Sequence, residues 1–210
     1  MPHRIFLLSP AYAGGQRARM IMSERAKFPL AERLRQEGAS LAEVFTFLSG
    51  LYFRGKIAYA RVFGCAADGS CTSLVITPTR GLIDAQTHIT LADLREFSEI
   101  DIKGDDPRYR KPLERDARRL ARSLPGDAEI VLLGSIASGK YVDALLRHFG
   151  ERLRFPGDFV GRGDMSRGGL LLRCAADGQE LEYIAVAGAI RKGKRPPKLT
   201  PRRYPKSCPF

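Results

Sequence analysis

The run Glu129-Ile-Val-Leu-Leu133 leads directly into Gly134-Ser-Ile-Ala-Ser-Gly-Lys140. The first part is a short β-branched and leucine-rich segment bounded by turn residues, which is typical of a buried strand. From Tyr141 to Phe149 the apolar residues recur at helical spacing. The first amides of a helix have no intrahelical partner and therefore favour an anion. The stretch predicts a strand–turn–helix unit with an anion-binding turn, in which Ser138 is the N-cap.

A second glycine-rich segment follows at Gly161-Arg-Gly-Asp-Met-Ser-Arg-Gly-Gly169. It precedes the apolar run 170–173, which we expect to be a strand. Residues 170–174 and 181–186, separated by Asp177-Gly178, predict a terminal hairpin. Two loops that are rich in glycine, hydroxyls and arginine suggest that one phosphate-bearing ligand is held between them.

The rest of the chain alternates strand and helix signals. We expect strands at 4–8 and 74–77, and helices at 16–27, at 51–63 and after the capping box Ser40–Glu43. A short helix should begin at Thr90, and a longer one should follow Asp106-Pro107, with an apolar stripe at Leu113, Ala117, Leu120 and Leu124. This alternation predicts an α/β fold with an open, mostly parallel central sheet flanked by helices, whose ligand crevice lies at the carboxyl ends of the strands.

The length and charge of the chain limit its organisation and partners. The 210 residues are 44% hydrophobic, enough for one core, so we expect one domain over residues 1–190 and an extended, basic, proline-rich arm over 191–210. The net charge of +12 and a pI near 9.9 point to a polyanionic partner. We find no run of membrane-spanning length and no signal peptide, and we expect a cytoplasmic monomer.

Metal and cofactor chemistry is not indicated by the cysteines. Cys65, Cys71, Cys174 and Cys208 have no CxxC spacing, which favours free thiols over a metal or iron–sulfur site. The prediction is therefore no metal and no cofactor.

Several polar and aromatic groups have two interpretations. The aromatic residues of 51–63 either pack the core or place one ring against a nucleobase. The arginine face of 107–123 is typical of a solvated helix surface. The segment Gly134–Lys140 also fits phosphate-loop spacing, but Tyr141 stands where Ser or Thr should hold magnesium. A P-loop-like nucleotide-binding enzyme remains an alternative.

Three segments resemble motifs of the uracil-DNA glycosylases, in the same order. Ile130 to Lys140 is similar to that family's Leu-Trp-Gly-x-x-Ala-x-x-Lys segment, and Met165-Ser-Arg-Gly-Gly169 resembles the end of its last motif. Leu7-Leu-Ser-Pro-Ala-Tyr12 resembles the strand that enters its water-activating loop. The resemblance implies a three-layer, glycosylase-like architecture. The segments Leu8 to Pro10, Tyr52 to Tyr59 and Ser135 to Tyr141 also resemble the YaaA-type peroxide-stress proteins. That family binds DNA and carries Ser-Pro-Ala near the N-terminus and Ala-Ser-x-x-Tyr late in the chain.

The chain departs from the glycosylase pattern at its chemical residues. Ser9 stands where that family has its water-orienting Asp, and its signature His is absent, with Arg162 as the nearest cation. The position of its uracil-reading Asn falls near Thr77. The resemblance therefore supplies no complete catalytic set.

Base excision requires a pocket for a flipped nucleotide, an aromatic face, stabilisation of the leaving base, and a group that orients water or stabilises the sugar cation. We assign the catalytic roles to Asp164, Arg162 and Ser9, although Asp164 also suits a helix cap and Arg162 a structural ion pair. Tyr12, Phe53 and Thr77 are the candidates for base binding. Met165 is the candidate wedge, and the phosphate contacts are assigned to Ser135, Ser138, Lys140, Ser166 and Arg167.

The sequence thus favours a DNA glycosylase that hydrolyses the N-glycosidic bond of a flipped-out damaged pyrimidine, with uracil as the first guess, in base excision repair. A non-catalytic, YaaA-like DNA-binding stress protein is the main alternative.

Overall fold

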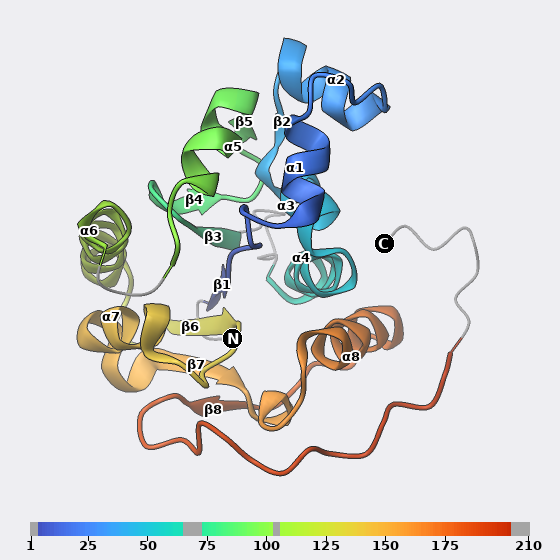
Figure 1. Cartoon of the computed structure of the whole chain (residues 1–210). Coiled ribbons are helices and arrows are strands. Elements are labelled where there is room, and N and C mark those ends of the chain that lie inside the picture. The colour runs from blue at the N-terminus through green and yellow to red at the C-terminus, as the bar shows by residue number, and fades with distance from the viewer. Residues whose placement is uncertain (1–3, 65–72, 103–105, 203–210) are drawn as a thin grey trace.

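The computed structural model describes residues 4–64, 73–102 and 106–202, and Figure 1 shows their arrangement. Its strands are β1 (Arg4–Leu8), β2 (Ala39–Ser40), β3 (Ser73–Thr77), β4 (Gly81–Asp84), β5 (His88–Ile89), β6 (Glu129–Leu133), β7 (Leu153–Pro156) and β8 (Tyr183–Ala185). Its α-helices are α1 (Gln16–Met22), α2 (Pro29–Gln36), α3 (Leu41–Ser49), α4 (Leu51–Phe63), α5 (Leu91–Ser98), α6 (Pro107–Ser123), α7 (Gly139–Phe149) and α8 (Asp164–Asp177). Short 3-10 turns occupy Gly150–Arg152 and Gly157–Phe159.

The central sheet has six strands in the described part, in the order β4-β3-β1-β6-β7-β8. The four inner strands are parallel, and the two edge strands, β4 and β8, are antiparallel to their neighbours. The α/β fold with a mostly parallel sheet is therefore confirmed. Strands β2 and β5 form a separate antiparallel pair.

Helices cover both faces of the sheet. Figure 1 shows α6 and α7 on one side, and α4 and α8 on the other. The inner strands β1 and β6 are buried on both faces, as their continuous apolar sequences predict. Helices α4 and α8 cross at two glycines: a Cβ on Gly55 would lie 2.6 Å from the Gly168 carbonyl oxygen, and a Cβ on Gly168 would lie 2.7 Å from the Leu51 carbonyl oxygen. This close approach sets the position of both helices.

Most predicted helix starts are confirmed. The Ser40 hydroxyl accepts the Glu43 amide, and Thr90 with Asp93 forms a capping box. Asp106 caps α6, with Pro107 at its first turn. The helix expected at 16–27 is shorter and ends at Met22, before Ser23 in extended conformation.

The predicted terminal hairpin is wrong. Residues 170–174 lie inside α8, and residues 161–163 alone remain as loop before this helix begins. A short apolar run cannot be assigned to strand or helix by its periodicity. Here the buried positions Gly168, Leu171, Leu172 and Ala175 recur at helical spacing against α4. Of the second half of the hairpin, Tyr183–Ala185 forms an edge strand, which pairs with β7.

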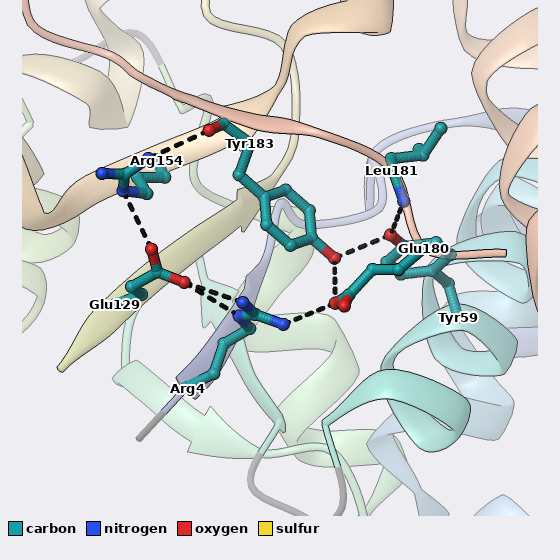
Figure 2. A network of polar contacts seen from close by, with 7 residues as sticks. All are labelled: Arg4, Tyr59, Glu129, Arg154, Glu180, Leu181 and Tyr183. Carbon is teal, nitrogen blue, oxygen red and sulfur yellow. Dashed lines mark hydrogen bonds and ion pairs between the residues drawn. The ribbon is translucent and has the colours of Figure 1, made fainter. Parts of the chain in front are cut away.

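A polar network closes the amino end of the sheet (Figure 2). Arg4 donates to Glu129 (2.8 and 3.1 Å) and to Glu180 (2.6 Å), which joins β1 to β6 and to the segment before β8. Arg154 of β7 pairs with Glu129 (3.1 Å) and donates to the Tyr183 carbonyl oxygen (3.0 Å). These charged groups are engaged with one another, so the amino end is a structural junction.

The segment after β8 forms no helix or strand through residue 202. In Figure 1 it runs along the edge of the sheet towards α8. Arg173 of α8 donates to the Thr200 carbonyl oxygen, and Arg202 pairs with Asp177 (2.7 Å). The rest of the predicted arm, residues 203–210, lies outside the described residues, as do Cys65, Cys71 and Cys208. Cys174 is a buried free thiol.

Candidate functional site

A pocket of about 420 Å³ opens at the carboxyl ends of β1, β3 and β6. Strand order reverses here, because the chain continues from β1 to β3 on one side and returns through β6 on the other. Open α/β sheets bind ligands at such switch points. The Ser9 amide donates to the Leu133 carbonyl oxygen (3.2 Å), so β1 and β6 stay paired up to the pocket. We call this space the switch-point pocket.

The switch-point pocket brings together predicted site residues that are far apart in the sequence. Its wall includes Ser9, Tyr12, Ser135, Ser138, Lys140 and Asp164. The first two follow β1, the next three follow β6, and Asp164 begins α8. The sequence predicts that the segments near Pro10, Gly134 and Arg162 share one cleft. The first two segments line this pocket, whereas the third reaches it only through Asp164.

Three other predicted site residues lie on a neighbouring groove. Arg162, Met165 and Ser166 line a space of about 320 Å³ between α8 and the arm, which also includes Arg173, Arg195, Lys198 and Leu199. We call it the arm groove. Arg162 donates to the Asp158 carbonyl oxygen (2.9 Å) and to the Ser166 hydroxyl (3.3 Å), and Met165 is 67% exposed. Arg162 is thus not among the residues lining the switch-point pocket.

Phe53, Thr77 and Arg167 are buried and do not line the pocket, contrary to their predicted roles. Phe53 packs edge-on against Phe45 in the core. The Thr77 hydroxyl donates to the Gly81 carbonyl oxygen (3.0 Å) and closes the β3–β4 turn. Arg167 donates to the Phe159 carbonyl oxygen (3.1 and 3.3 Å). Base stacking, base reading and phosphate binding are incompatible with these positions.

The amino end of α7 faces the pocket. Ser138 occupies the predicted N-cap position, but its side chain makes no capping hydrogen bond. The first amides of α7 therefore have no side-chain cap, and the exposed Lys140 adds a positive charge. Position 134 has no room for a side chain, because Ser9 and Tyr141 pack against it. A Cβ on Gly134 would lie 2.8 Å from the Ser9 Cβ and 2.9 Å from the Tyr141 hydroxyl oxygen. The glycine thus serves close packing beneath an anion-binding helix end.

A buried lysine stands behind Ser9. Lys56 of α4 is 1% exposed, and its Nζ lies 2.5 Å from the Ser9 carbonyl oxygen and 2.9 Å from Ser9 Oγ. The rings of Tyr52 and Phe53 contact the amine at 4.5 and 4.6 Å from their centroids. Burial is the main reason that the pKa of Lys56 is lowered to about 7. The negative charge of Asp164 raises this pKa, and the positive charge of Arg167 lowers it. Lys56 makes no ion pair with any carboxylate in the described ranges.

Two buried tyrosines complete the wall beside Ser9. The Tyr141 hydroxyl donates to the Ser135 carbonyl oxygen (2.8 Å), and burial raises the pKa of this phenol to about 12. The Tyr52 hydroxyl is buried without a hydrogen-bond partner among residues 4–64, 73–102 and 106–202. Burial also raises the pKa of Tyr52, so this hydroxyl stays protonated.

Asp164 is the exposed carboxylate of the α8 end of the pocket. Its side chain is 69% exposed and lies 3.2 Å from the Arg167 guanidinium. Asp101, which follows α5, also lines the pocket. A group of three or more His, Cys, Asp or Glu side chains arranged to hold a metal does not occur in the described part of the chain.

Comparisons with protein-family models, curated proteins and solved structures found no match. The site must therefore be interpreted from its own geometry. Among the residues that the structure describes, no helix is long and apolar enough to cross a membrane.

Lys56, Tyr52 and Asp101 were not among the predicted site residues. For Lys56 a signal exists in the sequence: it interrupts the aromatic stripe Tyr52, Tyr59 and Phe63 at helical spacing, so a helix that buries these rings must also bury the amine. Asp101 has no such signal, because its place on the wall depends on the packing of α5.

Proposed function

We propose that the protein binds DNA and hydrolyses the N-glycosidic bond of a damaged pyrimidine nucleotide that is extruded into the switch-point pocket. The supporting observation is the meeting of an exposed carboxylate, Asp164, an exposed aromatic ring, Tyr12, and the uncapped amino end of α7 around one space. A volume of about 420 Å³ lies within the range of small-molecule sites. The net charge of +12 supplies attraction to a polyanion.

The same proposal includes a uracil-DNA glycosylase-like, three-layer architecture. It is supported by two of the three glycosylase-like segments lying on one pocket, at residues 9–12 and 135–140. The third segment, Met165–Gly169, begins α8, so Asp164 lies on the pocket while Met165 lies on the arm groove. A strand bound along the arm groove would therefore pass the mouth of the pocket at this helix end.

Each required chemical role has a candidate group. Tyr12 is 71% exposed and presents a ring on which a base can stack. The Asp164 carboxylate can stabilise positive charge on the sugar and accept a proton from the attacking water. The bond from C1′ to the base nitrogen breaks as the water oxygen bonds to C1′, and the base departs with the electron pair. The α7 amides and Lys140 stabilise that anion, the role assigned from sequence to Arg162.

A single-turnover assay tests the proposal. Uracil-containing oligonucleotides are incubated with excess protein and then treated with alkali, which cleaves at abasic sites. We expect cleavage that falls at least about 100-fold in Asp164→Asn. Asp127→Asn is the matched control, because Asp127 is an exposed carboxylate beside the amino end of β6. The absence of abasic sites with uracil and with other lesion bases would refute the catalytic proposal.

A non-catalytic DNA-binding role is the second candidate. It is favoured by the burial of Phe53 and Thr77, which leaves the pocket without two of the three predicted base-binding groups. In that case the affinity for DNA falls with increasing salt, as phosphate contacts require, but no abasic site is formed. Asp164→Asn then leaves the affinity for DNA unchanged.

A further inference from the structure

We propose that Ser9 is a nucleophilic hydroxyl which the buried amine of Lys56 activates, so that the switch-point pocket can cleave a small carboxylic ester through an acyl-serine. The geometry that carries this inference is the 2.9 Å contact between Lys56 Nζ and Ser9 Oγ, with Ser9 on the pocket wall and Lys56 behind it. A serine with an adjacent base is the general signature of nucleophilic catalysis, and lysine replaces histidine in some serine enzymes.

The two contacts of Lys56 are compatible with a neutral amine. A neutral amine has two N–H donors and one lone pair. Lys56 Nζ donates to the Ser9 carbonyl oxygen at 2.5 Å and to Ser9 Oγ at 2.9 Å. In the neutral amine the contact to Ser9 Oγ can reverse, so that the lone pair accepts the hydroxyl hydrogen. The main-chain contact holds the amine within hydrogen-bond distance of the hydroxyl.

The surroundings of Lys56 favour its role as a proton acceptor. On its own helix the rings of Tyr52 and Phe53 exclude water from the amine. From α8, Arg167 opposes a positive charge on it and Asp164 favours one. Since burial is the largest influence and lowers the pKa of Lys56 to about 7, a large fraction of the amine is neutral at physiological pH.

The pocket also holds groups that can receive an ester. The uncapped amides of α7 can stabilise an oxyanion, as helix amino ends do in acyl transfer. Tyr52 lines the same wall, and its buried hydroxyl has no hydrogen-bond partner among the residues that the structure describes. These groups and Ser9 come from different elements but share one pocket.

The reaction balances with water alone. Ser9 Oγ bonds to the carbonyl carbon as its proton moves to Lys56 Nζ, and the tetrahedral intermediate carries its charge on the former carbonyl oxygen. Collapse breaks the bond to the alkoxy oxygen, which leaves as the alcohol after taking the proton from Lys56. Water then attacks the acyl-serine with the same proton transfers, which releases the carboxylic acid and restores Ser9.

Covalent labelling tests the inference on the full chain. An alkyl fluorophosphonate, which reacts with activated serines, is incubated with the protein, and the adduct is measured by intact mass and located by peptide mapping. We expect an adduct on Ser9, lost in Ser9→Ala and kept in Ser49→Ala, since Ser49 lines the same pocket without a lysine contact. The labelling rate should rise about tenfold per pH unit below pH 7 and level off above it. No adduct at pH 8, while a serine esterase in the same tube reacts, would overturn the inference.

Lys56 variants separate proton transfer from a structural role. Lys56→Met removes the base with little change of volume, and Lys56→Arg keeps a cation that cannot accept a proton. Both should slow labelling at least about 100-fold. Labelling of Lys56→Arg at the wild-type rate would overturn the inference.

A further variant covers the case in which both lysine substitutions prevent folding. Ser9→Cys is alkylated with iodoacetamide in the presence of wild-type Lys56, with Ser49→Cys as its control. The alkylation rate of the thiol at position 9 should rise with pH around a midpoint below the ordinary cysteine pKa of about 8.5. A midpoint pH at or above that value would overturn the inference. The ester proposal is tested by labelling of Ser9, which Ser9→Ala removes. The glycosylase proposal is tested by the formation of abasic sites and its loss in Asp164→Asn, so either proposal can fail without the other.

Discussion

The hydroxyl of Tyr59 lies 2.7 Å from that of Tyr183 and accepts the Leu181 amide at 2.8 Å (Figure 2). Because the Tyr183 hydroxyl donates to Glu180 (2.7 Å), the Tyr59 hydroxyl is the donor of the pair. One phenol on α4 therefore connects the helix that carries Lys56 to the edge strand β8. Tyr59 also packs edge-on against Phe6 of β1, with 5.8 Å between ring centroids.

Removal of this hydroxyl should destabilise the fold. Tyr59→Phe leaves the Leu181 amide without its acceptor and Tyr183 without its donor, so we expect a loss of about 1–2 kcal/mol in the free energy of unfolding. Urea denaturation followed by circular dichroism measures it. Tyr12→Phe is the control, since Tyr12 is 71% exposed and should show no change. Equal stability of Tyr59→Phe and wild type would contradict the assigned hydrogen bonds.

Two adjacent glycines of α8 should respond in opposite directions to alanine. A Cβ on Gly168 would lie 2.7 Å from the Tyr52 Cα, whereas a Cβ on Gly169 meets only Leu199, at 3.6 Å. Gly168→Ala should cost about 1–3 kcal/mol by overpacking the α4–α8 crossing. Gly169→Ala should be neutral or add about 0.5–1 kcal/mol through helix propensity. Thermal unfolding of both variants is the measurement, and the opposite order of stability would show that the helices are not in close contact.

The buried amine of Lys56 predicts a pH-dependent stability. Its pKa is lowered to about 7 in the folded chain from an ordinary 10.5, so above pH 7 the unfolded state binds more protons. Stability attributable to Lys56 should therefore increase as pH rises above 7, by at most about 1.4 kcal/mol per pH unit. Denaturation of wild type and Lys56→Met between pH 6 and 9 measures the difference, which should change in favour of wild type with increasing pH. A difference that is constant with pH would mean an ordinary pKa for Lys56.

Sequence reasoning succeeded where one pattern had one structural meaning. The apolar runs of β1 and β6 each end at a turn signal, Ser9-Pro10 and Gly134, which favoured buried strands, and Ser138 is the N-cap of α7 as predicted. The run 170–173 failed because four apolar residues fit a strand or a helix, and the partner that decides between them, α4, lies over a hundred residues earlier in the chain.

The candidate site was predictable only in its loops. Ser9, Ser135 and Ser138 follow parallel strands, so a shared edge of the sheet follows from the topology. By contrast, Arg162 and Asp164 are two residues apart yet lie on different spaces, because α8 begins between them. Phe53 was assigned to a base although it is completely buried, since residue type alone does not show which side of α4 faces the core. The orientation of a helix about its axis thus limits such predictions.

The arm groove should carry part of the affinity for DNA. Arg195 and Lys198 are exposed there and make no hydrogen bond or ion pair to the part of the chain that the structure describes, so both are available to phosphates. Log affinity falls linearly with log salt, by about 0.9 for each phosphate contacted. The double variant Arg195→Ala, Lys198→Ala should therefore weaken binding and reduce that slope by up to about 2, measured by fluorescence anisotropy of a labelled duplex at several salt concentrations.

The control for this prediction is the arginine face of α6, on the other side of the sheet. Arg118→Ala, Arg119→Ala removes the same charge from exposed positions that we interpret as solvated surface. Because net charge changes equally in the two double variants, a general electrostatic effect predicts equal losses, whereas a strand bound in the arm groove predicts a changed slope for the arm variant alone. An unchanged slope in the arm variant would place the DNA elsewhere on the molecule, and with it would remove the route by which a strand reaches Asp164.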